Sequence, residues 1–199
     1  MRKIASVFSL ALCFAVMIVS PAFAQDDEEE DDKNDKTTPA EKRAKIDEVS
    51  KEALKTVLDS DESAKALFEK AYGYAVFDNL KLSLFFSTAR GRGEAVKKSD
   101  GSKIYMRMGS VGLNLGLGGQ KCQVVFLFEN QAVFDKFVDK GWQADAGANA
   151  VAGTSGANAE ASFRNGMAVY QITEKGLMLQ ADIAGTKYWK DKKLNKTES

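Results

Sequence analysis

The residues that follow Thr38 combine apolar and charged side chains with the period of an α-helix. Thr38, Pro39 and Glu41 supply a capping hydroxyl, a proline in the first turn and an acid at the third position, which together mark a helix start. The apolar positions recur at helical spacing: Ile46, Val49, Ala53, Leu54, Val57 and Leu58. The basic positions lie mostly elsewhere on the helix surface: Lys42, Arg43, Lys45, Lys51 and Lys55. The pattern therefore predicts a basic amphipathic helix.

A second, shorter helix is predicted to start near Ser60. The residues that it should bury are spaced three or four apart or lie next to one another: Ala64, Leu67, Phe68 and Ala71. Gly73 then interrupts the helical pattern, so we expect the helix to end just before it.

Strand patterns dominate the next part of the chain. Leu80–Thr88 is apolar on both faces, which is typical of a buried strand. Glu94–Lys98 and Lys103–Met108 flank an Asp-Gly turn sequence at Ser99–Gly101, and we expect them to form a β-hairpin. In Val111–Gly118 the apolar residues alternate mainly with glycines, which would let another backbone, a ligand or a helix approach the sheet closely.

The central part of the chain predicts one more strand and one more helix. Val124–Phe128 is apolar on both faces and should form a central strand. Asn130 is positioned to cap a short helix that Gly141 ends. The apolar residues of this helix are Val133, Phe134, Phe137 and Val138. Trp142–Ala161 is rich in small residues, and its pattern fits either a loop or a strand in a crowded sheet.

Two C-terminal runs, Met167–Thr173 and Leu177–Ala184, are predicted to close the sheet. With two or three helices and about seven or eight strands, the pattern predicts an α+β fold. We expect the N-terminal helices to pack on a curled, mostly antiparallel sheet of barrel-like or sandwich shape.

The N-terminal residues have the features of a secretory signal peptide. Arg2 and Lys3 precede an apolar core, and Ala22–Ala24 supplies small residues for cleavage. Seven consecutive acids follow at Asp26–Asp32, and such a run predicts disorder. This run would either screen a basic face of the domain or serve only as a solubilising spacer. We therefore expect a signal peptide over 1–24, an acidic disordered tail over 25–37, one domain over 38–190 and a polar C-terminal tail over 191–199.

The composition argues against most catalytic chemistry. The chain contains no histidine, the commonest general base and metal ligand. Beyond the leader Cys122 is the single cysteine, so we expect it to be a buried strand residue without a disulfide or a zinc ion. The glycine-rich run over residues 112–119 lacks both the phosphate-loop and the dinucleotide-binding patterns. Asp78 and Glu94 could form a carboxylate pair, but nothing else in the sequence supports one. We expect no enzyme activity, no cofactor and no bound metal.

One segment, Ala71–Glu94, resembles the opening of the SYLF domain, a lipid-binding domain also known from yeast actin-organising proteins. In this segment a helix end leads into a glycine-punctuated strand and then into Arg90–Gly93, which we interpret as a tight turn. The positions that carry the resemblance are Ala71, Gly73, Ala75, Val76, Phe77, Gly91 and Gly93. Residues 111–137 and 166–189 are similar to later strands of the family, so the resemblance covers roughly residues 42–190. Asp78 stands where the family usually carries proline.

The resemblance implies a non-enzymatic lipid-binding protein. Eukaryotic members bind phosphoinositides and also bind and bundle actin, whereas an exported bacterial member would meet the phospholipids of the cell envelope. Without Arg2, Lys3 and the seven acids, 26 basic and 21 acidic residues remain, so the domain is mildly basic and suits an anionic membrane surface. The predicted lipid-binding residues lie on the first helix and around the first hairpin: Lys42, Arg43, Lys45, Lys51, Lys55, Arg90, Arg92, Lys97 and Lys98. Lys103 stands with them at the hairpin.

Two other interpretations stay open at this point. The first helix could simply dock its apolar stripe on the sheet while its lysines are solvated. The protein could also be a structural or protein-interaction module of the envelope, with an envelope protein as partner and no lipid ligand. Nucleic-acid binding has only the basic excess and the two arginines of Arg90–Gly93 in its favour, and export argues against it. We expect an exported protein of the periplasm, with peripheral attachment to the outer membrane as a second location.

Overall fold

The computed structural model describes residues 36–83, 87–112, 118–143, 162–173, 176–178 and 186–196. The chain divides into two compact units, residues 1–36 and 37–199, and every described residue except Lys36 belongs to the second. The expected signal peptide and the run of acids lie outside the described residues.

The first helix, α2 (Pro39–Ser60), starts where the capping sequence predicts. The Thr38 hydroxyl accepts a hydrogen bond from the Glu41 N–H at 3.2 Å, and the Glu41 carboxylate accepts one from the Thr38 N–H at 2.8 Å. This capping box satisfies backbone donors that the first turn otherwise leaves unpaired. The buried residues of α2 are Ile46, Ser50, Ala53 and Val57, so the predicted stripe is confirmed at three positions and includes a serine.

The second helix, α3 (Glu62–Lys70), follows after one residue, Asp61, which ends α2 and caps α3. The Asp61 carboxylate accepts hydrogen bonds from the N–H groups of Ser63 at 2.8 Å and Ala64 at 3.2 Å. Ala64 and Leu67 are buried, as predicted. The chain therefore turns sharply here because one carboxylate holds the start of α3.

Asp61→Ala should lower the free energy of unfolding by about 1–2 kcal/mol, because two backbone donors of α3 lose their acceptor. Urea unfolding of both proteins measures this loss. Asp61→Asn keeps an acceptor oxygen at the same place and should stay within about 0.5 kcal/mol of the wild type. Equal losses in the two variants would show that the charge of Asp61, rather than the cap, matters.

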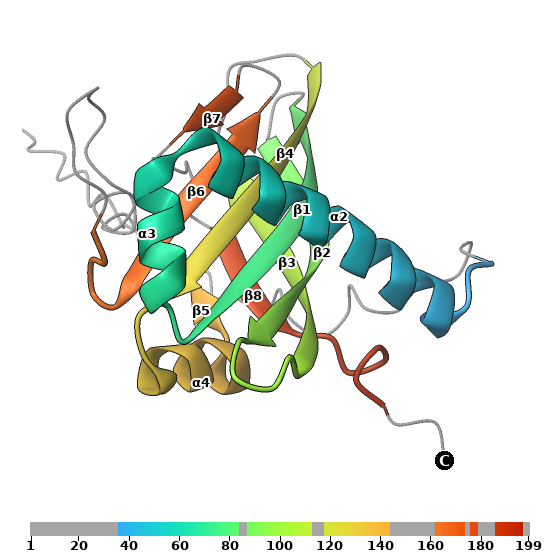
Figure 1. Ribbon diagram of the computed structural model, residues 1–199. Helices are drawn as coiled ribbons and strands as arrows, with labels where there is room; N and C mark the ends of the chain where they lie inside the picture. The colour runs from blue at the N-terminus through green and yellow to red at the C-terminus, as the bar shows by residue number, and fades with distance from the viewer. Residues whose placement is uncertain are drawn as a thin grey trace, which may run out of the picture. The chain divides into compact units, whose positions relative to one another are not determined.

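The strands form one antiparallel sheet that curls around its own inner face, as Figure 1 shows. Among the described residues the strand order is β5-β8-β3-β2-β1-β4-β6-β7. The strands are β1 (Gly73–Ser83), β2 (Ser87–Lys97), β3 (Lys103–Gly112), β4 (Gly118–Phe128), β5 (Trp142–Gln143), β6 (Met167–Thr173), β7 (Gly176–Met178) and β8 (Thr186–Lys190). A third described helix, α4 (Gln131–Lys140), lies between β4 and β5. The predicted α+β fold with a curled antiparallel sheet is confirmed.

Two sequence predictions about β1 and β2 are wrong. Leu80–Thr88 is not one strand, because Leu80 pairs with Arg90 and Ser83 pairs with Ser87 across a hairpin. Arg90–Gly93 is not a turn either, since it lies inside β2. Apolar side chains continue through the end of one strand and the start of the next, so hydrophobic periodicity alone could not reveal the chain reversal.

The glycine at position 93 has a packing role. A Cβ atom there would lie 2.0 Å from the carbonyl oxygen of Val76 and 2.7 Å from the ring of Phe77. Only glycine allows β1 and β2 to approach this closely.

The other strand and helix predictions are partly confirmed and partly wrong. The hairpin of β2 and β3 is confirmed, with Val96 opposite Lys103 and Gly101 in the turn at φ 69°. β4, α4 and β6 are also confirmed, and Asn130 caps α4. The predicted single strand over 111–118 is wrong, since residues 111–112 end β3 and residue 118 begins β4, on opposite sides of the β1–β2 pair. The short strand β8 was not predicted, and most of the small-residue tract lies outside the described residues.

The inner face of the sheet holds an aromatic core. Phe77, Phe126 and Tyr188 form its centre, with ring centroids 4.7 Å apart for Phe77 and Tyr188 and 5.1 Å apart for Phe126 and Tyr188. Phe137 of α4 packs on Phe128 at 4.9 Å and closes this core at one end of the sheet (Figure 1). Cys122 is buried, as expected.

The outer face of the sheet is covered by α2 and α3 (Figure 1). Ala53 and Val57 of α2 pack with Val76, Val125 and Tyr170 of the strands in a second cluster. The apolar stripe of α2 is therefore docked on the sheet. This finding supports the interpretation that α2 docks on the sheet. The charged side chains of α2 lie at its edges and on its outer side.

Candidate functional site

A cavity of about 440 Å³ lies between α2 and the outer face of the sheet. Its walls come from one edge of α2 and from three neighbouring strands: Asp47, Glu48, Lys51, Leu54, Tyr74, Glu94 and Lys103. The size falls within the range of about 300–1,000 Å³ that is typical of small-molecule sites. We call this space the α2 cavity.

Helical and strand periodicity explain why these side chains meet. Asp47, Lys51 and Leu54 are spaced four and three apart, so they share one edge of α2 beside its buried stripe. Glu94 lies opposite Tyr105 in the β2–β3 ladder. Tyr74 and Lys103 are each opposite Val96, so all these strand residues point to the face that α2 covers.

Three charged groups form the inner wall of the cavity. The Lys103 ammonium lies 2.9 Å from Asp47 Oδ2 and 3.2 Å from Glu94 Oε2. The Tyr105 hydroxyl donates a hydrogen bond to Asp47 Oδ1 at 3.0 Å. Asp47, Glu94 and Lys103, which we call the charged triad, thus place two carboxyl groups around one ammonium.

Glu94 is the buried member of the charged triad. Its side chain is 3% exposed, whereas those of Asp47 and Lys103 are 37% and 36% exposed. The Lys103 ammonium lies 3.2 Å away as an ion-pair partner, and Glu94 Oε2 has no hydrogen-bond partner among the described residues. A buried carboxylate oxygen without a donor is costly, so this oxygen favours a proton or an incoming donor.

The surroundings shift the pKa values of both carboxyl groups. Burial, reinforced by the nearby Asp47 carboxyl group, raises the pKa of Glu94 to about 7 against the pull of Lys103. Burial opposes ionisation of Asp47 too, but the hydrogen bonds that it receives from Lys103 and Tyr105 outweigh burial and lower its pKa. A proton entering the pair therefore goes to Glu94 first.

The C-terminal residues hold the far side of this site. Asn195 accepts a hydrogen bond from the Tyr105 N–H at 2.9 Å and donates one to the Tyr105 carbonyl at 2.6 Å. Arg43 of α2 donates to the Leu194 carbonyl at 3.2 Å. Asp191 and Leu194 are buried, so the start of the segment expected as a polar tail packs against β3 and α2.

The structure separates the predicted basic residues of α2. Lys51 lines the α2 cavity, while Lys45 and Lys55 are exposed elsewhere on the helix. Lys55 forms an ion pair with Asp59. Lys42 is half-buried, and Arg43 contacts Leu194 as described above.

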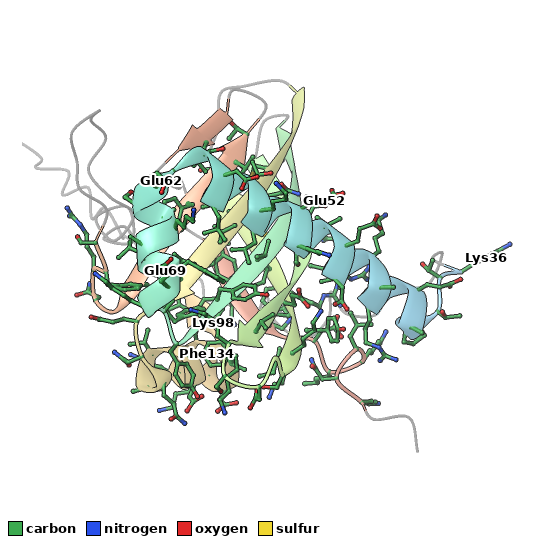
Figure 2. The ribbon with its side chains drawn as sticks, viewed as in Figure 1. Lys36, Glu52, Glu62, Glu69, Lys98 and Phe134 are labelled. Atoms are coloured by element: carbon green, nitrogen blue, oxygen red, sulfur yellow. The ribbon has the colours of Figure 1, made fainter. Side chains whose placement is uncertain are left out.

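The predicted basic residues of the hairpin have partners within the protein. Lys97 lies 3.1 Å from Asp100. Lys98 donates hydrogen bonds to the carbonyls of Phe68 and Glu69 at the end of α3 and lies 4.5 Å above the Phe68 ring (Figure 2). Burial lowers the pKa of Lys98. A cation at the C-terminal end of a helix is stabilising, so Lys98 stabilises the end of α3.

The two predicted arginines of β2 lie beyond the cavity. Arg90 is exposed and Arg92 is half-buried. Arg92 stands between Asp78 of β1 and Arg107 of β3 in the sheet register. Because neither arginine lines the α2 cavity, the nine predicted residues do not form one site.

The family-signature residues are structural. Ala75, Val76 and Phe77 are fully buried, and Ala71 ends α3. Gly73, like Gly93, faces a backbone oxygen, since a Cβ there would lie 2.7 Å from the Val96 carbonyl oxygen. Gly91 is half-buried in β2.

Sequence reasoning missed most of the α2 cavity. Asp47, Glu48, Tyr74 and Tyr105 received no role, and Glu94 was considered only as a partner for Asp78. One usable signal was present, because Glu94 is a lone acid in the otherwise uncharged strand segment 93–96. Buried acids of this kind often mark a functional site.

Two kinds of feature are absent from the described residues. No group of three or more His, Cys, Asp or Glu residues there could hold a metal ion. No helix in that part of the chain is long and apolar enough to cross a membrane.

Comparisons with known proteins identify the family. Residues 109–197 match the Ysc84 family, described as Las17-binding protein actin regulator. Over 160 residues the chain is 48% identical to the protein named Beta cell expansion factor A of Aeromonas veronii, and the match covers 80% of this chain. The chain spans about 61% of the length of that relative. The chain belongs to the SYLF (Ysc84) family.

Proposed function

We propose that this protein binds phospholipid at a membrane surface without catalysing a reaction. The observation that carries the proposal is a cavity, in a family of actin- and lipid-binding domains, whose charged groups of both signs stand next to Leu54 and Tyr74. Phospholipid headgroups carry charges beside apolar carbon, so they complement such a wall.

Because the apolar stripe of α2 is docked, the helix would meet a membrane through charge rather than by insertion. Lys42, Lys45 and Lys55 lie outside the α2 cavity and would approach anionic headgroups. Acids stand on the same helix, among them Glu52, which lies on the outer side of α2 (Figure 2). The attraction is therefore local and should weaken strongly with salt.

We also propose that the protein works outside the cytoplasm, in the cell envelope. The support is the sequence pattern of residues 1–24, with two basic residues, an apolar core and small residues before Gln25. The cell envelope contains phospholipids but no actin.

Changing Lys42, Lys45 and Lys55 together to glutamine should lower the affinity for anionic vesicles by about 100-fold at low salt. Each lysine near an anionic surface contributes about 1 kcal/mol, and 1.4 kcal/mol is a factor of ten. Vesicle flotation of the variant and the wild type, at two salt concentrations, measures the effect. The melting temperature should fall only slightly, because Lys45 and Lys55 are exposed and only Lys42 is half-buried.

The matched control removes acids from the same helix. Glu52→Gln with Asp59→Asn should strengthen binding to anionic vesicles several-fold, because two repulsive charges disappear. If the wild type fails to float with anionic vesicles at low salt, the lipid proposal is wrong and a protein partner becomes the better explanation. If the lysine variant floats like the wild type, α2 does not face the membrane.

A further inference from the structure

We propose that the α2 cavity takes a phosphoethanolamine-type group, with its primary ammonium at Glu94 and Asp47 and its phosphate at Lys51. This inference rests on the proposed lipid function and names the headgroup that the cavity selects. Four observations carry it: the charge of the inner wall, the unpaired oxygen of Glu94, the apolar wall and the position of Lys51.

The inner wall attracts a cation. Asp47 and Glu94 share a single counter-ion, Lys103, which lies within 3.2 Å of both carboxyl groups. When both carboxyl groups are ionised, one negative charge of the charged triad is uncompensated. An additional ammonium would balance it.

The unpaired oxygen selects a primary ammonium. Glu94 lines the cavity, and its side chain is only 3% exposed. Its Oε2 has no hydrogen-bond partner among the described residues, although the Lys103 ammonium lies 3.2 Å away. A primary ammonium carries N–H donors that can satisfy this oxygen. A quaternary ammonium such as choline carries none, so it would leave the oxygen unpaired.

The apolar wall suits the carbon linker of the ligand. Leu54 and Tyr74 both line the cavity, and the Tyr74 ring packs against Phe68 with ring centroids 5.7 Å apart. Methylene groups gain contact with such side chains. The Tyr74 ring is also a favourable neighbour for an ammonium.

Lys51 provides the anion contact at the mouth of the cavity. It is exposed, lines the cavity and has no ion-pair partner within the described parts of the chain. It follows Asp47 by one helical turn, which separates the two positions by about 6 Å. The two-carbon linker of phosphoethanolamine holds its ammonium and phosphate a similar distance apart, so both charges can be met at once.

The test compares vesicles that differ only in the headgroup. Wild-type protein is mixed with phosphatidylcholine vesicles that contain or lack phosphatidylethanolamine, at pH 8, and binding is measured by flotation. We expect at least tenfold tighter binding to the vesicles with phosphatidylethanolamine. Equal binding to both kinds of vesicle would overturn the inference.

Two variants connect the preference to the cavity. Glu94→Gln and Lys51→Gln should each reduce the preference to less than threefold. The control Glu52→Gln, on the outer side of α2, should keep the preference. A Glu94→Gln protein that retains the full preference, with an unchanged circular dichroism spectrum, would remove the cavity from the inference.

The arms of the experiment separate the sources of the ligand and the two proposals. If free phosphoethanolamine binds in calorimetry while vesicles show no preference, the cavity takes a soluble molecule and the lipid assignment is overturned. If anionic vesicles bind but no headgroup preference exists, the inference fails and the proposed function stands. If the protein binds no vesicle of any composition, the proposed lipid function is wrong, and the inference that rests on it is wrong too.

The preference should also depend on pH. The titratable groups that face Glu94 come from α2, β1 and β3: Asp47, Glu48, Lys51, Tyr74, Lys103 and Tyr105. Burial raises the pKa of Glu94 to about 7. An ammonium binds the ionised carboxylate and not the protonated acid. The affinity for phosphatidylethanolamine vesicles should therefore be constant above pH 7 and should decrease below it, by up to about tenfold for each pH unit. A preference that is constant from pH 5.5 to pH 8 would contradict a contact with Glu94.

Discussion

Gly93→Ala is expected to lower the free energy of unfolding by about 4 kcal/mol or more, enough to unfold much of the protein. The added Cβ would lie 2.0 Å from the Val76 carbonyl oxygen and 2.9 Å from the Phe77 Cα atom. Both contacts involve the backbone of β1, which is paired on its other edge with β4 and cannot move aside cheaply. Overpacking of this kind forces a backbone shift through the centre of the sheet. Urea unfolding followed by far-ultraviolet circular dichroism measures the loss.

The matched control for this change is Gly101→Ala. Gly101 has φ 69° and no heavy atom within 4 Å of a Cβ at that position. The cost there is only that of a left-handed backbone conformation, about 1–2 kcal/mol. A Gly93→Ala protein as stable as Gly101→Ala would mean that β1 and β2 can separate, and the packing role of Gly93 would be wrong.

Glu94→Gln should make the protein more stable at pH 8 and leave its stability unchanged at pH 4. In the folded protein the pKa of Glu94 is raised from 4.5 to about 7 by burial. Between these values the folded state binds a proton that the unfolded state has released, so wild-type stability falls as the pH rises from about 4.5 to 7. Well above pH 7 the full penalty is present, about 3 kcal/mol. Glutamine stays neutral throughout and does not pay it.

The measurement is the difference in the free energy of unfolding between variant and wild type at pH 4, 6 and 8. The shift of Asp100 cancels in this difference. The pKa values of Asp47 and Asp100 are both lowered below 3.8, so their effects fall at more acidic pH. Glu48→Gln is the matched control, because it removes a carboxyl group from an exposed position of the same cavity. If Glu94→Gln is less stable than the wild type at pH 8, the Lys103 ion pair stabilises the ionised carboxyl group more than burial destabilises it.

The described helices could be predicted from the sequence because their signals are local. The Thr38 capping box, the Asn130 cap and the positive φ of Gly141 each involve residues within one or two helical turns. The buried strand β4 was also predictable, since a short run of five apolar residues rich in valine and phenylalanine favours a buried strand. Backbone hydrogen bonding and burial act at the level of a few residues in all these cases.

The strand boundaries around the first hairpin could not be predicted in the same way. Apolar residues run from the end of β1 into β2, and Arg90–Gly93 contains glycines that equally suit a turn. Which role the glycines have depends on how closely β1 approaches β2. That distance is set by the whole sheet and not by the neighbours of Gly93 in the sequence.

The sequence by itself determined the family resemblance, the fold class and the amphipathic pattern of α2, because each depends on short-range pattern. The tertiary structure decided that the apolar stripe of α2 is docked on the sheet. Only the tertiary structure brought Asp47 of α2 within 2.9 Å of Lys103 of β3 and buried Glu94 beside them. In the folded protein Lys97 and Lys98 have partners within the chain. The sequence alone assigned both of them, like Lys51, to lipid binding. The reason is physical: the pKa of a carboxyl group and the availability of a lysine depend on burial and on charges across space, which residues distant in the chain supply.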